Sequence, residues 1–365
     1  MEKYYLASIQ HIFTMNGSIV KKLLDYFGTG ENIWQAGADE INHARILNDE
    51  QFNYYVNFKA NNKNFPERLA EQCQQKKIAV SSIDDGDYPP LLREIFNPPY
   101  VIFYRGTLQN NFTRIAMVGS RKITPYGRAA AKQFSSAIAG NGFCVVSGAA
   151  YGVDTESHKG ALRAGTTEAV LGCGVDVAYP SSNRKLLDEI AEKGAVISEY
   201  IPGAPPKKIN FPARNRIIAG MAVGILVVEA SSRSGSLITA EHGISSGRDI
   251  FAVPGSIFST SSIGCNQLIQ QGAKLVLDSE DIITEYKKIK RKTLSQKNGN
   301  IEKDFVLSAE EKRIYSLLTY DTPLSIDEII YKLHGSSPAN TAFLLLQMEL
   351  RGLVESNEAQ LYVRK

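Results

Sequence analysis

Short apolar runs recur through the middle of the chain, and stretches with helical character separate them. The runs are near-continuous in valine, isoleucine, leucine and alanine, as in strands buried on both faces of a sheet. The predicted strands are residues 115–119, 143–148, 168–174, 195–200, 224–230, 249–255 and 273–278. The predicted helices lie near residues 125–140, 153–164, 182–193, 211–221, 236–247, 263–271 and 279–287. This alternation predicts an α/β fold with a doubly wound parallel sheet.

Ligands of such sheets bind beyond the carboxyl ends of the strands, so the residues that follow each strand are the candidates. Residues 119–122, Gly-Ser-Arg-Lys, follow the first predicted strand, and Thr124 and Pro125 suit a helix start. A glycine turn before a helix exposes backbone N–H groups, which suits a phosphate. Arg121 and Lys122 add positive charge, which favours an anion site over a plain turn with exposed bases.

Glycines also follow the next strand. Ser147 and Gly148 open a segment in which Gly152 is a second point of close backbone approach to a ligand. Asp154 ends this segment, and it suits a helix cap as well as a ligand contact.

Residues 205–220 combine basic side chains with an aromatic ring. Lys207 and Lys208 precede Phe211, and Arg214 and Asn215 follow it. Bases can track a phosphate backbone while a nucleobase stacks on the ring, which is typical of single-strand binding. Taken alone, this stretch equally allows Phe211 to pack inward beneath exposed bases.

The flanking segments differ in composition from the centre. We predict a helical domain over 1–75, an α/β domain over 76–286, a basic flexible linker over 287–304 and a further domain over 305–365. The last segment reads as helices near 309–319, 325–333 and 337–351, followed by a hairpin. Its third helix carries one basic residue, Arg351, and its apolar side chains follow helical spacing, so we expect them to form core.

Composition narrows the function classes. The net charge is +3, but residues 110–220 hold 14 basic and 8 acidic residues, a local excess that can attract a polyanion. The longest uncharged apolar run, 217–228, is too short to span a bilayer, and the N-terminus does not resemble a signal peptide. The four cysteines are scattered, which fits a reducing cytoplasm and predicts neither disulfides nor a metal site.

No enzyme motif is evident. The glycine loops fit neither the dinucleotide fingerprint nor the phosphate-binding loop of ATPases. No arrangement of serine, histidine and acid suggests a nucleophile. We therefore expect no catalytic residue, no metal and no cofactor.

Several motifs, in this order, resemble the DprA/Smf family of bacterial DNA-processing proteins. They cover about residues 80–280, and they are Gly119-Ser120-Arg121, Ser147-Gly148, Gly152-Val153-Asp154, Gly172-Cys173-Gly174, Tyr179-Pro180, Phe211 to Ile218, Glu229-Ala230, Ser234 to Ala240 and Pro254-Gly255. Residues 1–75 resemble the family's sterile-alpha-motif-like or helix-hairpin-helix segment. Residues 305–365 resemble its C-terminal winged helix.

The resemblance implies an extended Rossmann-like fold and a cytoplasmic, non-catalytic protein that binds single-stranded DNA. It further implies a homodimer that protects incoming DNA in natural transformation and loads the RecA recombinase. In the family's pocket, Arg121, Lys208 and Phe211 would contact DNA, whereas Ser147, Gly148, Arg214 and Asn215 would shape it. The full set of candidate DNA-binding residues is Gly119, Ser120, Arg121, Lys122, Ser147, Gly148, Lys207, Lys208, Phe211, Arg214 and Asn215.

Two other functions stay open at this point. Residues 235–241 faintly echo the loop of nucleoside-monophosphate phosphoribohydrolases, with Glu241 as the acid, although the leading Pro-Gly-Gly is missing. A winged helix could instead read duplex DNA, but the segment 305–365 has 6 basic and 8 acidic residues, which argues against strong duplex binding.

Overall fold

The computed structural model describes residues 1–14, 16–290, 307–320, 322–333, 337–357 and 361–364. The N-terminal part is helical, with caps at several helix starts; Thr29 and Asn48, for example, accept from backbone N–H groups of the helices they precede. Its helices are α1 (Glu2–Ile12), α2 (Gly17–Phe27), α3 (Gly30–Gln35), α4 (Ala38–His43), α5 (Asp49–Asn61) and α6 (Phe65–Gln75).

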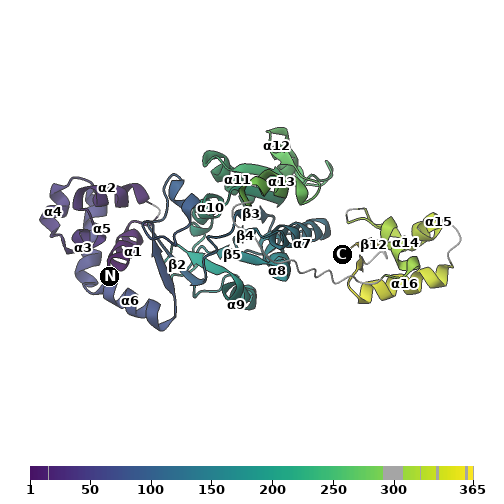
Figure 1. Cartoon of the computed structure of the whole chain (residues 1–365), viewed down its shortest axis with the longest axis horizontal. Helices are drawn as coiled ribbons and strands as arrows, with labels where there is room; N and C mark the ends of the chain where they lie inside the picture. The colour runs from purple at the N-terminus through teal and green to yellow at the C-terminus, as the bar shows by residue number, and fades with distance from the viewer. Residues whose placement is uncertain (15, 291–306, 321, 334–336, 358–360, 365) are drawn as a thin grey trace.

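Strands and helices alternate through the centre of the chain (Figure 1). The strands are β1 (Ala79–Ser82), β2 (Val101–Gly106), β3 (Arg114–Gly119), β4 (Cys144–Ser147), β5 (Thr166–Val170), β6 (Ala195–Ser198), β7 (Gly224–Glu229), β8 (Asp249–Ala252) and β9 (Lys274–Leu275). The helices are α7 (Pro125–Gly140), α8 (Val153–Ala164), α9 (Arg184–Lys193), α10 (Asn210–Met221), α11 (Gly235–Ser245), α12 (Ile263–Gln270) and α13 (Glu280–Lys290), with short 3-10 turns at Pro90–Glu94 and Ser181–Asn183.

The central strands form one sheet in the order β1-β2-β6-β5-β4-β3-β7-β8-β9. From β6 to β9 all neighbours are parallel, whereas β2 pairs antiparallel with both β6 and β1. The chain runs outward from β3 to β6 on one side and from β7 to β9 on the other. The strand order therefore reverses between β3 and β7, which is where sheets of this kind bind ligands.

Helices cover both faces of the sheet, and alternate side chains of each strand serve the two layers. On β3, Ile115 and Met117 pack with α7, α8 and α13, whereas Ala116 and Val118 pack with α10, α11 and α12. Burial on both faces explains why the parallel strands are near-continuous apolar runs in the sequence.

The N-terminal helices and one end of the sheet share a single apolar core. Ile9 and Leu23 belong to the same buried cluster as Val101 and Phe103 of β2 and Ile190 of α9. Figure 1 shows these helices beside β2. Apolar side chains from both sides of the predicted boundary at residue 75 thus pack in the same core.

The C-terminal elements bury a core of their own, which includes Ile314, Ile329 and Leu345. They are α14 (Ala309–Leu317), β10 (Leu324–Ser325), α15 (Ile326–Leu333), α16 (Pro338–Leu350), β11 (Val354–Ser356) and β12 (Leu361–Arg364). The strands form a small antiparallel sheet in the order β10-β12-β11. No helix within the described residues is long and apolar enough to cross a membrane.

The predicted α/β architecture agrees with this structure in its main lines, with three corrections. The sheet is mostly parallel rather than wholly so, because β1 and β2, which no local pattern predicted, extend it in antiparallel fashion. The run 168–174 ends as a strand at Val170, and 273–278 supplies only the short β9. The predicted linker, 287–304, begins inside α13, and residues 291–304 lie outside the described residues.

A buried histidine on α8 gives the fold a pH dependence that can be tested. His158 is inaccessible, and its Nδ1 lies 2.8 Å from the hydroxyl of Thr167, which itself donates to the carbonyl of Val145. Burial lowers the pKa of His158 from 6.5 to about 3. The folded protein therefore keeps this ring neutral where the unfolded chain would protonate it.

We predict that acid weakens the fold through His158. A depressed histidine pKa means that stability is present above pH 6.5 and is lost as the pH falls from there toward about 3. The free energy of unfolding should fall by about 2 kcal/mol between about pH 7 and pH 5 from this group. Urea unfolding at both pH values measures the loss, and His158→Gln should reduce it. An equal loss in both proteins would contradict the assignment.

Candidate functional site

A cavity of about 650 Å³ opens at the carboxyl ends of β3 and β7, where the strand order reverses. Helices α8, α10, α11 and α12 all begin at or beside it, so the positive ends of their helix dipoles lie near this region. The cavity is lined by Val118, Gly119, Ser120, Arg121, Lys122, Ala150, Asp154, Phe211, Pro212, Arg214, Asn215, Ile218, Ser231, Ser234, Gly235, Ser236, Ile238, Thr239, Thr260 and Ser261.

The loop between β3 and α7 is held by the end of β7. The backbone N–H of Ser120 donates to the carbonyl of Glu229 (2.7 Å), and the buried Glu229 carboxylate accepts from the N–H of Thr124 (3.0 Å). The Ser120 hydroxyl donates to the carbonyl of Lys122 and accepts from its N–H, which closes a tight turn. Arg121 and Lys122 are thereby exposed on a fixed loop.

Phe211, at the start of α10, is half-buried on the cavity wall. Its ring rests on Gly172, where an added Cβ would lie 3.0 Å from the ring. The guanidinium carbon of Arg121 lies 5.8 Å from the ring centroid, within cation–π range. An aromatic face and a cation are thus held side by side at the cavity.

A buried arginine supports the cavity floor. Arg214 is 3% exposed, and its guanidinium donates to the carbonyls of Gly148 (3.0 Å) and Val170. Gly148 has no space for a side chain, because a Cβ would lie 2.6 Å from the Arg214 guanidinium and 2.7 Å from the Asp154 carboxylate. Burial lowers the pKa of Arg214, and burial raises the pKa of Asp154 against the opposing charge of Arg214. This buried pair organises the floor beneath the exposed Arg121 and Lys122.

Known proteins share this framework. The model of the family described as DNA recombination-mediator protein A matches residues 79–287, which include the whole sheet and the cavity. The chain belongs to the DprA/Smf family. It is 47% identical over 215 residues to the DNA processing protein DprA of Streptococcus pneumoniae, covering 58% of this chain and 75% of that protein. It is 37% identical over 288 residues to the protein Smf of Synechocystis, covering 77% and 72%.

Solved structures of DprA/Smf proteins are also similar to this chain. The crystal structure of DprA from S. pneumoniae superposes with a TM-score of 0.67 at 38% identity, covering 78% of this chain and 98% of that one. DprA from Helicobacter pylori, whose structure is described as giving insight into its single-stranded DNA binding mode, has a TM-score of 0.53 at 27% identity. It covers 57% of this chain and 96% of its own. The mostly parallel sheet is accordingly Rossmann-like.

The structure gathers most of the predicted site residues around one cavity. Those that line it are Gly119, Ser120, Arg121, Lys122, Phe211, Arg214 and Asn215. Ser147 and Gly148 lie beneath, where the Ser147 hydroxyl donates to the carbonyl of Met117 (2.6 Å) and does not reach the cavity. Ser147, Gly148 and Arg214 are thus placed to shape the floor.

The two lysines before α10 lie apart from the lining. Lys207 and Lys208 are exposed on the loop between β6 and α10. Lys207 lines a second hollow, between this loop and the N-terminal helices, together with His11, Tyr54 and Tyr200. Glu241, the acid of the alternative enzyme reading, is exposed on α11 and is not part of the cavity lining.

Sequence reasoning left part of the lining out of the candidate set. Ser231, Ser234 and Ser236 come from the loop and first turn that open α11. Thr260 and Ser261 were missed altogether; the run of hydroxyl residues before the helix at 263 was the available signal. The role of Glu229 as a holder of the opposite loop depends on strand neighbours and leaves no local signal.

We predict that the loop between β4 and α8 tolerates no side chain at Gly152. This residue has φ 78°, and a Cβ would lie 2.1 Å from the carbonyl oxygen of Ser120. Gly152→Ala should lower the free energy of unfolding by about 2–4 kcal/mol, because strain adds to a backbone clash. Urea unfolding measures it. Gly235→Ala is the matched control, since nothing lies within 4 Å of its added Cβ; equal effects of both substitutions would contradict the geometry.

Proposed function

We propose that this protein binds single-stranded DNA at the cavity between β3 and β7. The observation that carries the proposal is the fixed pairing of the Arg121 guanidinium with the half-buried ring of Phe211. Phosphates meet Arg121, Lys122 and the exposed Lys208, while a nucleobase stacks on the aromatic wall. The structure of H. pylori DprA is described by its single-stranded DNA binding mode, and this supports single-stranded DNA as the ligand of the present protein.

The wider role follows the resemblance to the family. We propose a non-catalytic, cytoplasmic protein that protects incoming single strands in natural transformation and loads RecA on them. The alternative, a phosphoribohydrolase-like enzyme, has no support from Glu241, which is exposed outside the cavity lining. Residues 1–75 would act as a sterile-alpha-motif-like helical cap, 76–286 as the DNA-binding domain and 287–304 as a tether.

The C-terminal elements support a winged-helix proposal for residues 305–365. Their order is helix, strand, two helices and a two-stranded hairpin. The expectation that the apolar side chains of the third helix form core holds only in part: α16 buries Leu345 and Met348 but exposes Phe343, Leu346 and Leu350. Apolar side chains offer no charge to a duplex, so we propose that this domain contacts a protein partner rather than duplex DNA.

The DNA-binding proposal predicts that Arg121→Ala with Lys208→Ala strongly weakens single-strand binding. Losing two charge-assisted phosphate contacts should weaken affinity at least about a hundredfold. The slope of log affinity against log salt should also fall by about 1.4, near 0.7 per lost contact. Fluorescence anisotropy with labelled oligonucleotides measures both, and Lys63→Ala, an exposed lysine outside the site, is the control.

The outcomes separate the parts of the proposal. Unchanged affinity in the double variant with a normal thermal unfolding curve would reject the site. Equal binding of duplex and single strands by the wild-type protein would reject strand selectivity. Single-strand binding without faster RecA filament assembly would retain the DNA site and reject the loading role.

The homodimer proposal concerns the far edge of the sheet. Strand β9 ends the sheet in the described residues, and Leu275 and Leu277 are exposed on and beside it. Phe258 is exposed as well. An open strand edge with apolar side chains is a surface that a second copy can cover.

We predict that Leu275→Asp with Leu277→Asp converts a dimer to a monomer, since charges on an apolar contact disfavour burial. Light scattering coupled to size exclusion measures the mass. Tyr26→Asp, at an exposed aromatic on α2, should leave the dimer intact. A dimeric double variant would place the contact elsewhere.

A further inference from the structure

Two tyrosines outside the cavity continue its aromatic wall. Tyr179, on the connection between β5 and α9, is 46% exposed, and Tyr151, on the connection between β4 and α8, is 54% exposed. The ring centroid of Tyr179 lies 5.1 Å from that of Phe211, with the planes 33° apart. The row of groups Arg121, Phe211 and Tyr179 therefore extends from the cavity onto the open surface.

Tyr151 lies between the loop that carries Tyr179 and the loop that carries Arg121. Its hydroxyl lies 3.4 Å from the hydroxyl of Ser182, three residues after Tyr179. Its neighbour Gly152 packs so closely on the β3–α7 loop that a Cβ there would lie 2.8 Å from the carbonyl oxygen of Arg121. Three loops from three different strand ends thus meet around Tyr151 and Tyr179.

A buried asparagine fixes two of these loops to each other. The side-chain amide of Asn183 donates to the carbonyl of Ala149 (3.0 Å) and to the hydroxyl of Thr155 (2.8 Å). It is buried, so these bonds are protected from exchange with water. The exposed rings consequently sit on a framework that is ordered before any ligand binds.

Positive charge lies beside the rings. Arg184 and Lys185 follow Asn183 directly, and both are exposed at the first turn of α9. Bases at the start of a helix add their charge to the positive end of the helix dipole. Exposed aromatic faces flanked by such charges are the combination that holds successive nucleotides of a single strand.

We propose that Tyr151 and Tyr179, with Arg184 and Lys185, form a second subsite for single-stranded DNA. This inference rests on the proposed function of the cavity. Bases of the strand that leaves the cavity past Phe211 stack on the two tyrosines, and the following phosphates meet Arg184 and Lys185. The protein therefore engages more nucleotides than the cavity alone accommodates.

The test compares dT oligonucleotides of increasing length on full-length protein. Tyr151→Ala with Tyr179→Ala should weaken binding of long oligonucleotides at least about thirtyfold, and leave the shortest bound oligonucleotide unaffected. Tyr151→Phe with Tyr179→Phe keeps both rings and should bind like the wild-type protein. Tyr26→Ala removes a tyrosine that is 57% exposed on α2 and serves as the matched control.

Two further measurements separate stacking from charge. The ring deletions should leave the salt slope unchanged, whereas Arg184→Ala with Lys185→Ala should lower it by about 1.4. Tyr151→Trp should give fluorescence that long oligonucleotides quench, while the native Trp34, buried on α3, reports no change in the wild-type protein.

The outcomes distinguish this subsite from the cavity. If the tyrosine deletions bind every length like the wild-type protein, the subsite is rejected while the cavity proposal stands on Arg121 and Lys208. If they lose the short and long oligonucleotides equally, the rings support the cavity and are not a separate subsite. If the wild-type protein binds no single strand, both proposals fall together.

Discussion

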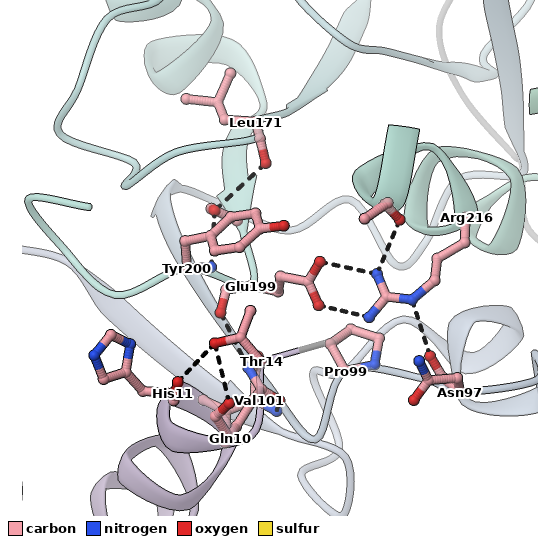
Figure 2. Close-up of polar contacts among 12 residues, drawn as sticks. Gln10, His11, Thr14, Asn97, Pro99, Val101, Leu171, Glu199, Tyr200 and Arg216 are labelled. Carbon is pink, nitrogen blue, oxygen red and sulfur yellow. Dashed lines mark hydrogen bonds and ion pairs between the residues drawn. The ribbon is translucent and has the colours of Figure 1, made fainter. Parts of the chain in front are cut away.

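The buried Glu199 and the partly buried Arg216 form a bidentate ion pair that joins the end of β6 to α10 (Figure 2), with N···O distances of 2.9 and 2.5 Å. The Arg216 guanidinium also donates to the carbonyl of Asn97. Desolvated charges are tolerated only where their partners are kept in place, so this pair allows α10 little freedom to shift. Arg214, two residues earlier, ties the same helix to the ends of β4 and β5. Phe211 owes its fixed position at the cavity to these anchors.

Glu199 is also hydrogen-bonded to the N-terminal helices. The Gln10 side chain on α1 donates to the carbonyls of Val101 (2.8 Å) and Glu199 (3.0 Å) and accepts from the N–H of Val101 (Figure 2). These backbone groups are buried, and without Gln10 they would lack their partner. Glu199 therefore binds α10 through its carboxylate and α1 through its backbone carbonyl. The N-terminal helices and the cavity belong to one connected structure, as their shared apolar core also indicates.

Sequence patterns predicted what depends on local chemistry. The β3 run and the Thr124-Pro125 helix start were readable, because period and cap suffice for them, whereas only the resemblance to the family implied that Arg121 and Phe211 share a site. The antiparallel β1 and β2 were not readable, because their place depends on pairing with the distant β6. Basic residues also look alike in a sequence: Arg214 is buried, whereas Lys208 is exposed beyond the lining, and only tertiary contacts separate them.

This difference in burial explains why one site contains both buried and exposed basic residues. A guanidinium beneath the cavity has planar donors that hold several carbonyls at once, which suits Arg214 for positioning loops. Its donors bind the carbonyls of Gly148 and Val170, and the neighbouring Asp154 carboxyl opposes its charge, so Arg214 adds little to the field at the protein surface. Arg121 and Lys122 are exposed on a loop whose conformation Glu229 fixes, so they keep their charge available to a polyanion. The reversal of strand order brings these two layers together, since it places the ends of β3 and β7 side by side while their following helices diverge to opposite faces.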